Sequence, residues 1–405
     1  MLRVLRLGMV LALVLTGCAT STLREAVPQQ LVERAEVPRM AGVRTWGDAG
    51  STVVGEFLKA EAPKLKTRYE QRMKSRKEFI VDVLALSGGA DDGAFGAGLL
   101  AGWTAAGTRP EFDLVTGISA GALIAPFAFL GPEYDRALAG VFNHGGGEIY
   151  QANILGGILG GSAVADSAPL AALISKYVDR RMLLRIAEER AKGRVLLVGT
   201  TNLDAQRPVY WDMGRIAQGR DARALDLFRK VLLASASLPG VFPPVHIAVT
   251  ADGKTYEEMH VDGGPTRQVF LTPTDFDFRS IDRIVGRKVP RRLWVVRNGK
   301  VDPEYSSVND TAFAIAGRSL ETLTKNQGIG DLIRMHAKAQ AEDIDYNLAY
   351  IPADFSAPRP GPFDKIYMNA LFERGFALGA GYVWAKAPPG VDASAPRSVN
   401  AAAQR

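Results

Sequence analysis

Several residue types that build common functional sites are scarce in this chain of 405 residues. A single cysteine excludes a disulfide framework and any cysteine-based zinc or iron–sulfur cluster. Four histidines leave little material for a metal site. The net charge is only +6, and so small a basic excess does not by itself indicate a nucleic-acid partner. With 47% hydrophobic and 23% charged residues, the composition is that of an ordinary globular protein.

The apolar run near the N-terminus is too short to span a membrane. It covers residues 7–15 and follows two arginines, whereas a membrane-spanning helix needs ~20 apolar residues, so we expect a signal peptide. The run ends in LTGC at residues 15–18, which resembles the lipobox of bacterial lipoproteins. The resemblance implies that residues 1–17 are removed and that Cys18 is lipidated. Ala19, in place of aspartate, implies the outer membrane; the alternative is an ordinary secretory signal.

The chain between residue 18 and residue 78 shows no sustained hydrophobic period at first and then becomes basic. Residues 18–78 therefore predict a tether followed by a helical lead-in. Residues 59–77 hold eight basic side chains against two acidic ones, and such a helix could lie on anionic headgroups or simply be solvated. Residues 385–405 are rich in proline, alanine and serine, which is typical of a disordered tail. The main folded domain is then expected over residues 79–384.

Two strand–glycine loop–helix units follow each other between residues 80 and 130. The strands are expected over residues 80–86 and 112–116, the glycine loops over 87–93 and 117–121, and the helices over 94–103 and 122–130. The first of these helices consists of small residues that could press closely on a sheet. This order predicts an α/β fold with a mostly parallel central sheet and helices on both faces. Ligands of such sheets bind at the C-terminal ends of the strands, where both loops lie.

Three kinds of site could explain the first glycine loop. Gly88 and Gly93 have the separation of a phosphate-binding Walker loop, but the Lys-Ser or Lys-Thr pair that should follow is missing. A dinucleotide fingerprint placed on residues 96–101 would lie inside the predicted helix. Consecutive glycines at a strand end do leave backbone N–H groups uncovered at a helix N-terminus. The loop therefore indicates an oxyanion hole.

The second loop contains a candidate nucleophile. Its sequence GISAG fits GxSxG, the nucleophile elbow, in which a strained turn between strand and helix exposes the hydroxyl of Ser119. Gly117 and Gly121 are needed because the turn brings backbone too close for a side chain. The predicted strand before and helix after Ser119 meet the requirement of the motif.

Four motifs in a fixed order carry a resemblance to a known family. They are SGGADDG at residues 87–93, GISAGAL at 117–123, ASASLPGVFPPV at 234–245 and VDGG at 261–264. Together they resemble the patatin-like phospholipase family, from about residue 79 to residue 299 and less fully to about residue 384. The resemblance implies a three-layer patatin-like catalytic domain over residues 79–384 and a Ser–Asp dyad without a histidine.

The family's functional residues map onto this sequence position by position. Ser119 matches the nucleophile and Asp262 matches the general base. The oxyanion hole matches the backbone amides of Gly88, Gly89 and Ala90. The expected substrate is a membrane phospholipid or lysophospholipid, with no nucleic acid, metal or organic cofactor involved. Because an ordinary aspartate is a poor base at neutral pH, we expect burial to raise the pKa of Asp262.

The chain departs from the family pattern at two positions of the first loop. Ala90 stands where the family has its third glycine, which is acceptable if the residue keeps a negative φ. Asp92 stands where the family commonly has arginine or lysine. That change removes a cation that could attract a phosphate headgroup.

Two alternative functions remain open from the sequence. His336 follows Ser119 and Asp262 in the order of a Ser-Asp-His carboxylesterase, but residues 331–338 predict the middle of an amphipathic helix. Because of Asp92, a non-catalytic, lipid-binding scaffold is the second alternative. The HGGG sequence at residues 144–147 follows the nucleophile and is therefore interpreted as a loop rather than an oxyanion hole. The apolar, glycine-rich residues 154–161 could form a lid or a buried turn.

Overall fold

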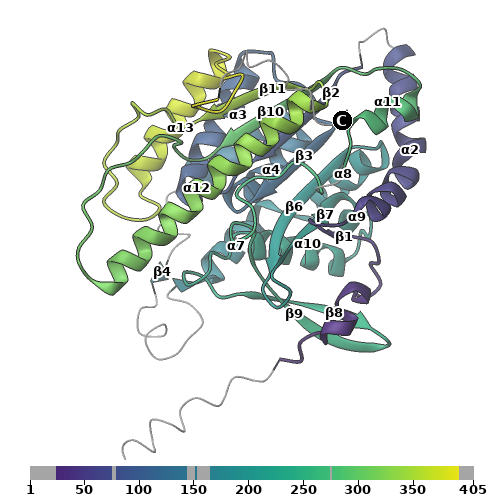
Figure 1. The fold of residues 1–405 in the computed structure, drawn as a ribbon, viewed down its shortest axis with the longest axis horizontal. Coiled ribbons are helices and arrows are strands. Elements are labelled where there is room, and N and C mark those ends of the chain that lie inside the picture. Colours follow the sequence, from purple (N-terminus) through teal and green to yellow (C-terminus); the bar gives the residue numbers. More distant parts are fainter. Residues whose placement is uncertain (1–23, 75–78, 144–150, 153–164, 274–275, 392–405) are drawn as a thin grey trace, which may run out of the picture.

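The computed structural model describes residues 24–74, 79–143, 151–152, 165–273 and 276–391. A nine-stranded sheet forms the middle layer, and helices cover both of its faces (Figure 1). The predicted α/β fold with a mostly parallel central sheet is thus confirmed. Among the described residues, no helix combines the length and the apolar character needed to cross a bilayer.

Five parallel strands form the centre of the sheet, in the order β6-β3-β2-β10-β11. Their bounds are β2 (Val81–Leu86), β3 (Leu114–Ile118), β6 (Val195–Asn202), β10 (Arg291–Arg297) and β11 (Asp345–Tyr350). Leu86, the last residue of β2, pairs with Gly117 of β3. The two glycine loops therefore leave the sheet side by side at its C-terminal edge, as the sequence predicted.

Four antiparallel strands extend this parallel centre. They are β1 (Arg44–Trp46), β7 (Arg207–Asp212), β8 (Val245–Ala251) and β9 (Lys254–Asp262). β9 pairs with the C-terminal half of β6, and Thr200 lies opposite Asp262. This pairing brings Asp262 to the same edge of the sheet as Ser119. A separate two-stranded sheet joins β4 (Gln151–Ala152) and β5 (Ala165–Asp166).

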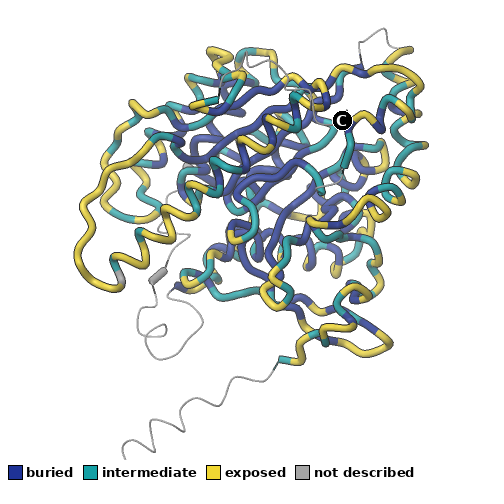
Figure 2. Tube along the Cα trace, in the orientation of Figure 1, coloured by how far each residue is buried: buried dark blue, intermediate teal, exposed yellow. Residues whose placement is uncertain are grey.

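The strands of the parallel centre are buried on both faces (Figure 2). Leu84 and Leu86 of β2 belong to one apolar core, whereas Val83 and Ala85 belong to the other. The first core is covered by α3 (Gly93–Ala105), α4 (Ala120–Leu130), α5 (Asp135–Asn143), α7 (Ala168–Tyr177), α8 (Arg180–Ala191), α9 (Met213–Ala217), α10 (Ala222–Ser235) and α13 (Lys365–Ala380). The second is covered by α2 (Ser51–Lys74), α11 (Arg279–Val285) and α12 (Ala312–Ala341).

The segment before residue 79 is more ordered than the expected tether. β1 adds an edge strand to the sheet by pairing with β7, and Val37 and Val43 enter the first core. α2 is fixed by Glu61, whose two carboxylate oxygens accept hydrogen bonds from Arg190 of α8 at 2.6 and 2.7 Å. The tether expected from the lack of hydrophobic period therefore includes a packed portion, because single apolar residues and ion pairs dock it.

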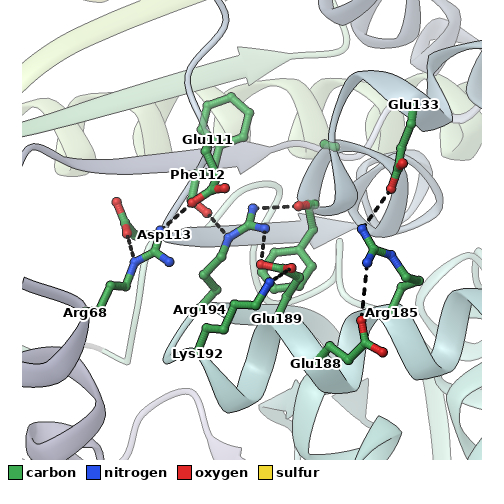
Figure 3. A network of polar contacts seen from close by, with 12 residues as sticks. Arg68, Glu111, Phe112, Asp113, Glu133, Arg185, Glu188, Glu189, Lys192 and Arg194 are labelled. Atoms are coloured by element: carbon green, nitrogen blue, oxygen red, sulfur yellow. Dashed lines mark hydrogen bonds and ion pairs between the residues drawn. The ribbon is translucent and has the colours of Figure 1, made fainter. Parts of the chain in front are cut away.

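The basic stretch of α2 is only partly exposed. Arg68 is buried and forms ion pairs with Asp113 and Glu111, at the end of the sheet away from Ser119 (Figure 3). Lys59, Lys66 and Lys74 are exposed. Arg68 therefore serves neither of the two roles considered for this stretch, because it is neither solvated nor able to reach a headgroup. The part of the stretch at residues 75–77 lies outside the described residues.

The small-residue helix α3 packs against another helix rather than closely on the sheet. A Cβ added to Gly98 or Gly102 would lie 2.0 Å from a carbonyl oxygen of α13, that of Phe372 or Phe376 respectively. In return, a Cβ added to Gly375 of α13 would lie 2.2 Å from the carbonyl oxygen of Phe95. The two backbones thus touch through reciprocal glycines, which no side chain could replace without moving the helices apart.

Candidate active site

Ser119 occupies a strained turn between β3 and α4. Its backbone angles are φ 55° and ψ −125°, a conformation that costs free energy for a residue with a side chain. The flanking glycines make this turn possible: a Cβ on Gly117 would meet the carbonyl oxygen of Gly121, and one on Gly121 would meet that of Leu86, both at 2.4 Å. The amide of Ser119 donates to Oγ of Ser235 at 3.0 Å. The structure thus has the backbone geometry of the nucleophile elbow that GxSxG predicted.

Asp262 ends β9 as a buried carboxyl group beside Ser119. Its Oδ1 accepts a hydrogen bond from the amide of Gly264 at 2.7 Å. Burial raises the pKa of Asp262 to about 6, and hydrogen bonding to the Ser119 hydroxyl and the Gly264 amide opposes this rise. Oδ2 is buried and has no well-aligned hydrogen-bond partner among the described residues. The expected rise of this pKa is confirmed.

The three predicted oxyanion donors are not equivalent. The amide of Gly88 donates to the carbonyl oxygen of Gln268 at 3.0 Å and is therefore occupied. The amides of Gly89 and Ala90 have no acceptor among the described residues, so they remain as donors for an oxyanion. Ala90 has a φ of 50°, so the condition under which alanine would be acceptable here, a negative φ, is not met. The sharp turn into the short helix Ala90–Asp92 requires the left-handed conformation that a glycine adopts more easily.

Two neighbouring residues at the end of β10 hold the oxyanion loop from behind. Nη1 of Arg297 donates to Oγ of Ser87 and to the carbonyl oxygen of Gly88, both at 3.3 Å. Asn298 donates from Nδ2 to the carbonyl oxygen of Ser87 at 2.8 Å and accepts from the amide of Gly96 at 3.0 Å. Both side chains are buried. The sequence offered only a weak signal for them, namely two polar residues directly after an apolar strand.

The acidic residues of the loop, Asp91 and Asp92, attach it to the C-terminal part of the chain. Asp91 forms an ion pair with Arg359, and Oδ1 of Asp92 accepts from the hydroxyl of Tyr367 at 2.7 Å. Burial raises the pKa of Asp92 to about 6, while the nearby charge of Arg359 lowers it. Asp92 thus has a structural contact that the comparison of motifs could not foresee, since Arg359 and Tyr367 are distant in sequence. Arg359 also returns a positive charge to this loop.

The described histidines lie apart from Ser119. His336 is buried on α12 against Tyr346 of β11, with ring centroids 5.0 Å apart, and two strands separate β11 from β3. His260 lies on β9, where its ring bonds Thr200 and Glu258 at 3.0 Å each. His246 is exposed on β8. The structure therefore does not bring His336 to Ser119 and Asp262, as a Ser-Asp-His triad would require.

Several predicted features lie outside the described residues. They are the signal peptide at residues 1–17, the lipidation site Cys18, the HGGG loop at 144–147, the apolar stretch at 154–161 and residues 392–405 of the predicted tail. The first part of that tail, residues 385–391, is described, and Ala385 pairs with Leu348 of β11. Within the part of the chain that the structure covers, no group of three or more His, Cys, Asp or Glu side chains could hold a metal ion.

Comparison with known proteins gives one family and distant structural neighbours. Residues 84–275 match the model of the Patatin family, described as patatin-like phospholipase. VipD from Legionella pneumophila is 11% identical, with a TM-score of 0.35, over 75% of this chain and 66% of its own. Human GIVD cytosolic phospholipase A2 is 11% identical, with a TM-score of 0.27, over 84% of this chain and 56% of its own. No sequence among the curated proteins is similar enough to count as a relative.

The matched residues 84–275 contain both glycine loops, Ser119 and Asp262. Residues 84–275 therefore match a patatin-like phospholipase domain, as the four motifs predicted.

Proposed function

We propose that this protein is an exported, lipid-anchored serine hydrolase that cleaves acyl esters of phospholipids or lysophospholipids through a dyad of Ser119 and Asp262. The observation that carries the proposal is the buried carboxyl group of Asp262, with a pKa of about 6, beside a serine in a nucleophile elbow. A carboxylate with that pKa is mostly ionised at neutral pH and is a better proton acceptor than an exposed aspartate. Of the described histidines, none is positioned to take that role.

The reaction runs in two halves. In the first, Asp262 accepts the proton of Ser119 while Oγ attacks the ester carbonyl carbon, and the amides of Gly89 and Ala90 stabilise the oxyanion. The carbon–oxygen bond to the glycerol backbone breaks, and Asp262 returns the proton to the leaving alcohol. In the second half, water attacks the carbonyl carbon of the acyl-serine while Asp262 accepts its proton. The bond between the acyl carbon and Oγ of Ser119 then breaks, Asp262 returns the proton to Oγ, and the fatty acid leaves. No metal or organic cofactor enters this scheme.

Export and anchoring are supported by the sequence alone. The short apolar run at residues 7–15 and the lipobox ending at Cys18 favour a lipoprotein of the outer membrane. An anchored enzyme would stay near its lipid substrate without a membrane-spanning helix. Anchoring through Cys18 does not depend on the dyad, so a Cys18→Ser variant can test it without affecting Ser119 or Asp262.

Labelling with a fluorophosphonate probe tests the nucleophile. The wild-type chain should react covalently at the activated serine, whereas Ser119→Ala should show no labelling above background. Ser235→Ala is a useful comparison, because Ser235 lies beside Ser119 and donates to Gly199 instead of contacting Asp262. We expect the label to persist in that variant. A folded wild-type protein that does not react would favour the lipid-binding scaffold.

A further inference from the structure

The first half of α12 buries none of its described side chains against the part of the protein that the structure describes. In the second half, the buried residues recur at helical spacing: Gly328, Asp331, Leu332, Met335, His336 and Ala339. Between residues 312 and 327, no described side chain is buried, and Figure 2 shows this end of the helix exposed, projecting from the molecule. Helices in water are marginal without a packed apolar face. Residues 312–326, here named the α12 tip, therefore form a helix whose surface is not covered by described residues.

The α12 tip is amphipathic, and its apolar side is the exposed one. Ile315, Leu320 and Leu323 have exposed fractions of 48%, 55% and 68%. At 3.6 residues per turn, Leu320 and Leu323 lie on one side of the helix, about 60° apart, whereas Arg318, Glu321 and Lys325 lie on the opposite side and Ile315 lies at the border between the two.

Two cations of the α12 tip pair with the exposed loop that precedes the helix. Arg318 donates a hydrogen bond to the carbonyl oxygen of Glu304, and Lys325 forms an ion pair with the Glu304 carboxylate at 3.0 Å. Arg318 also pairs with Glu321 within the helix, at 3.0 Å. The charges of the α12 tip are thus used internally, which leaves the apolar side directed outward.

This apolar surface adjoins the candidate active site. The chain leaves β10 at the edge of the sheet where Ser119 lies and returns through the α12 tip (Figure 1). Gln327 donates to the carbonyl oxygen of Pro265, three residues after Asp262, at 3.4 Å. Leu323 precedes Gln327 by four residues, which corresponds to ~6 Å along a helix axis. The loop before the helix adds Tyr305, which is 97% exposed.

We infer that the α12 tip is the surface by which the enzyme docks on a lipid aggregate, with Leu320 and Leu323 inserted among the acyl chains. The inference rests on the proposed hydrolysis of phospholipids, whose esters lie just below the headgroups of such an aggregate. Burying each leucine in hydrocarbon removes apolar surface from water and so favours binding. Because the charges of the tip are paired internally, docking does not require an anionic surface, and a zwitterionic lipid suffices.

The chain offers a clean way to test this docking. Cys18 is the only cysteine, so the full-length chain with Cys18→Ser can be labelled at one chosen position and loses any lipid at residue 18. In this background, Leu323→Cys places an environment-sensitive NBD fluorophore on the apolar side. Glu321→Cys is the matched control, since its side chain is 69% exposed but lies on the charged side. Each labelled protein is mixed with phosphatidylcholine vesicles.

The expected result is a several-fold rise in NBD emission at position 323, with quenching by brominated acyl chains, and little response at position 321. Equal responses at both positions, or none at 323, would overturn the inference. Emission at 323 that rises with protein concentration before vesicles are added would instead assign the surface to a second copy of the chain. A fluorophore that is already shielded in dilute protein would assign it to another segment of the same chain.

A kinetic comparison separates this inference from the proposed function. The double variant Leu320→Ser, Leu323→Ser should lose about tenfold per leucine in the hydrolysis of vesicle phospholipid, since each lost contact is worth at least ~1.4 kcal/mol. Turnover of a soluble short-chain ester should not change. Equal losses on both substrates would indicate a structural role and overturn the docking. A wild-type enzyme that hydrolyses neither substrate would contradict the proposed function instead.

Discussion

Asp262 carries a carboxyl group that the fold buries while giving it few hydrogen bonds. Oδ1 accepts one backbone amide, and Oδ2 has no aligned partner among the described residues. Water is a better solvent for a carboxylate than this environment, and the pKa rises to about 6 for that reason. The same shortage of partners leaves a lone pair of Asp262 available for the Ser119 proton. The burial of Asp262 with few hydrogen bonds thus both destabilises its charged form and makes it a better proton acceptor.

We predict that Asp262→Asn has opposite effects on activity and on stability. Turnover should fall by ~10⁴-fold, because asparagine cannot accept a proton. The native state binds the Asp262 proton more tightly than the unfolded state does, so this contribution to stability is present below pH 3.8 and is lost as the pH rises through about 6. Asparagine avoids the loss, and the variant should gain up to about 3 kcal/mol at pH 8. Urea unfolding at pH 4 and pH 8 measures the difference.

The pH profile of the wild-type enzyme belongs to the same prediction. Activity on a soluble ester should fall as the pH drops through about 6, when Asp262 becomes protonated. A histidine base would give a limb near 6.5, which is too similar to discriminate between the two mechanisms. His336→Ala therefore decides: a folded but inactive variant would contradict the dyad, whereas we expect nearly full activity.

At the level of single residues, the sequence predicted those residues of the candidate site that belong to recognisable motifs. The positions of Ser119 and Asp262 followed from GxSxG and from the VDGG motif. The contacts of Asp91 and Asp92 could not be predicted, because their partners come from a segment more than 260 residues later. The positive φ of Ala90 could not be predicted either, since it follows from the turn into the helix at that residue rather than from the residue type.

Among the secondary-structure elements, α3 and α13 pack most closely. Their glycines are reciprocal: Gly98 and Gly102 meet carbonyl oxygens of α13, and Gly375 and Gly379 meet those of α3. Dispersion contacts between two backbones replace the interdigitated side chains of ordinary helix pairs. Because α3 begins directly after the oxyanion loop, this packing also fixes the end of that loop.

We predict that Gly98→Ala destabilises the protein by at least ~1–3 kcal/mol, because the new methyl group would lie 2.0 Å from a carbonyl oxygen that belongs to backbone. Thermal and urea unfolding provide the measurement. Gly55→Ala in α2 is the control: no atom lies within 4 Å of its added Cβ, and alanine favours helix by ~1 kcal/mol. A tolerated Gly98→Ala, with unchanged stability, would show that the two helices can separate freely.

Element boundaries were predicted closely where the apolar pattern is simple. The first strand, expected at residues 80–86, is Val81–Leu86, and the second, expected at 112–116, is Leu114–Ile118. The second is shifted because Gly117 and Ile118 pair with β6, a neighbour that no local pattern reveals. The same limitation explains α3: its small residues indicate a close approach, but not that the partner is α13.

For the whole molecule, the order of the predicted strands and helices was enough to predict the fold class. It did not predict how much of the chain packs into the folded body. Two strand–loop–helix units were enough to predict a parallel sheet with helices on both faces. The antiparallel strands β1 and β7 were missed, and with them the docking of residues 24–74. That docking depends on ion pairs such as Glu61 with Arg190, whose partners are 129 residues apart.

We predict that Cys18→Ser releases the protein from membranes or blocks its processing, because the substituted residue cannot be acylated through sulfur. Radiolabelled palmitate should enter the wild-type chain only, and fractionation of cells should move the variant to the soluble fraction. Membrane association that remains as complete as in the wild type would indicate that the basic side chains of α2 or the α12 tip hold the protein without an anchor.

The contacts of Arg24 limit how far the folded body of such an anchored protein could lie from the membrane. Arg24 pairs with Asp204 and donates to the carbonyl oxygen of Glu257, so the folded body is fixed from that residue onward. Cys18 precedes Arg24 by six residues, which reach ~20 Å at most when fully extended. If Cys18 is acylated, the distance between the anchor and the folded body is therefore shorter than the thickness of a bilayer. Such an enzyme could work only on the leaflet that carries its own anchor.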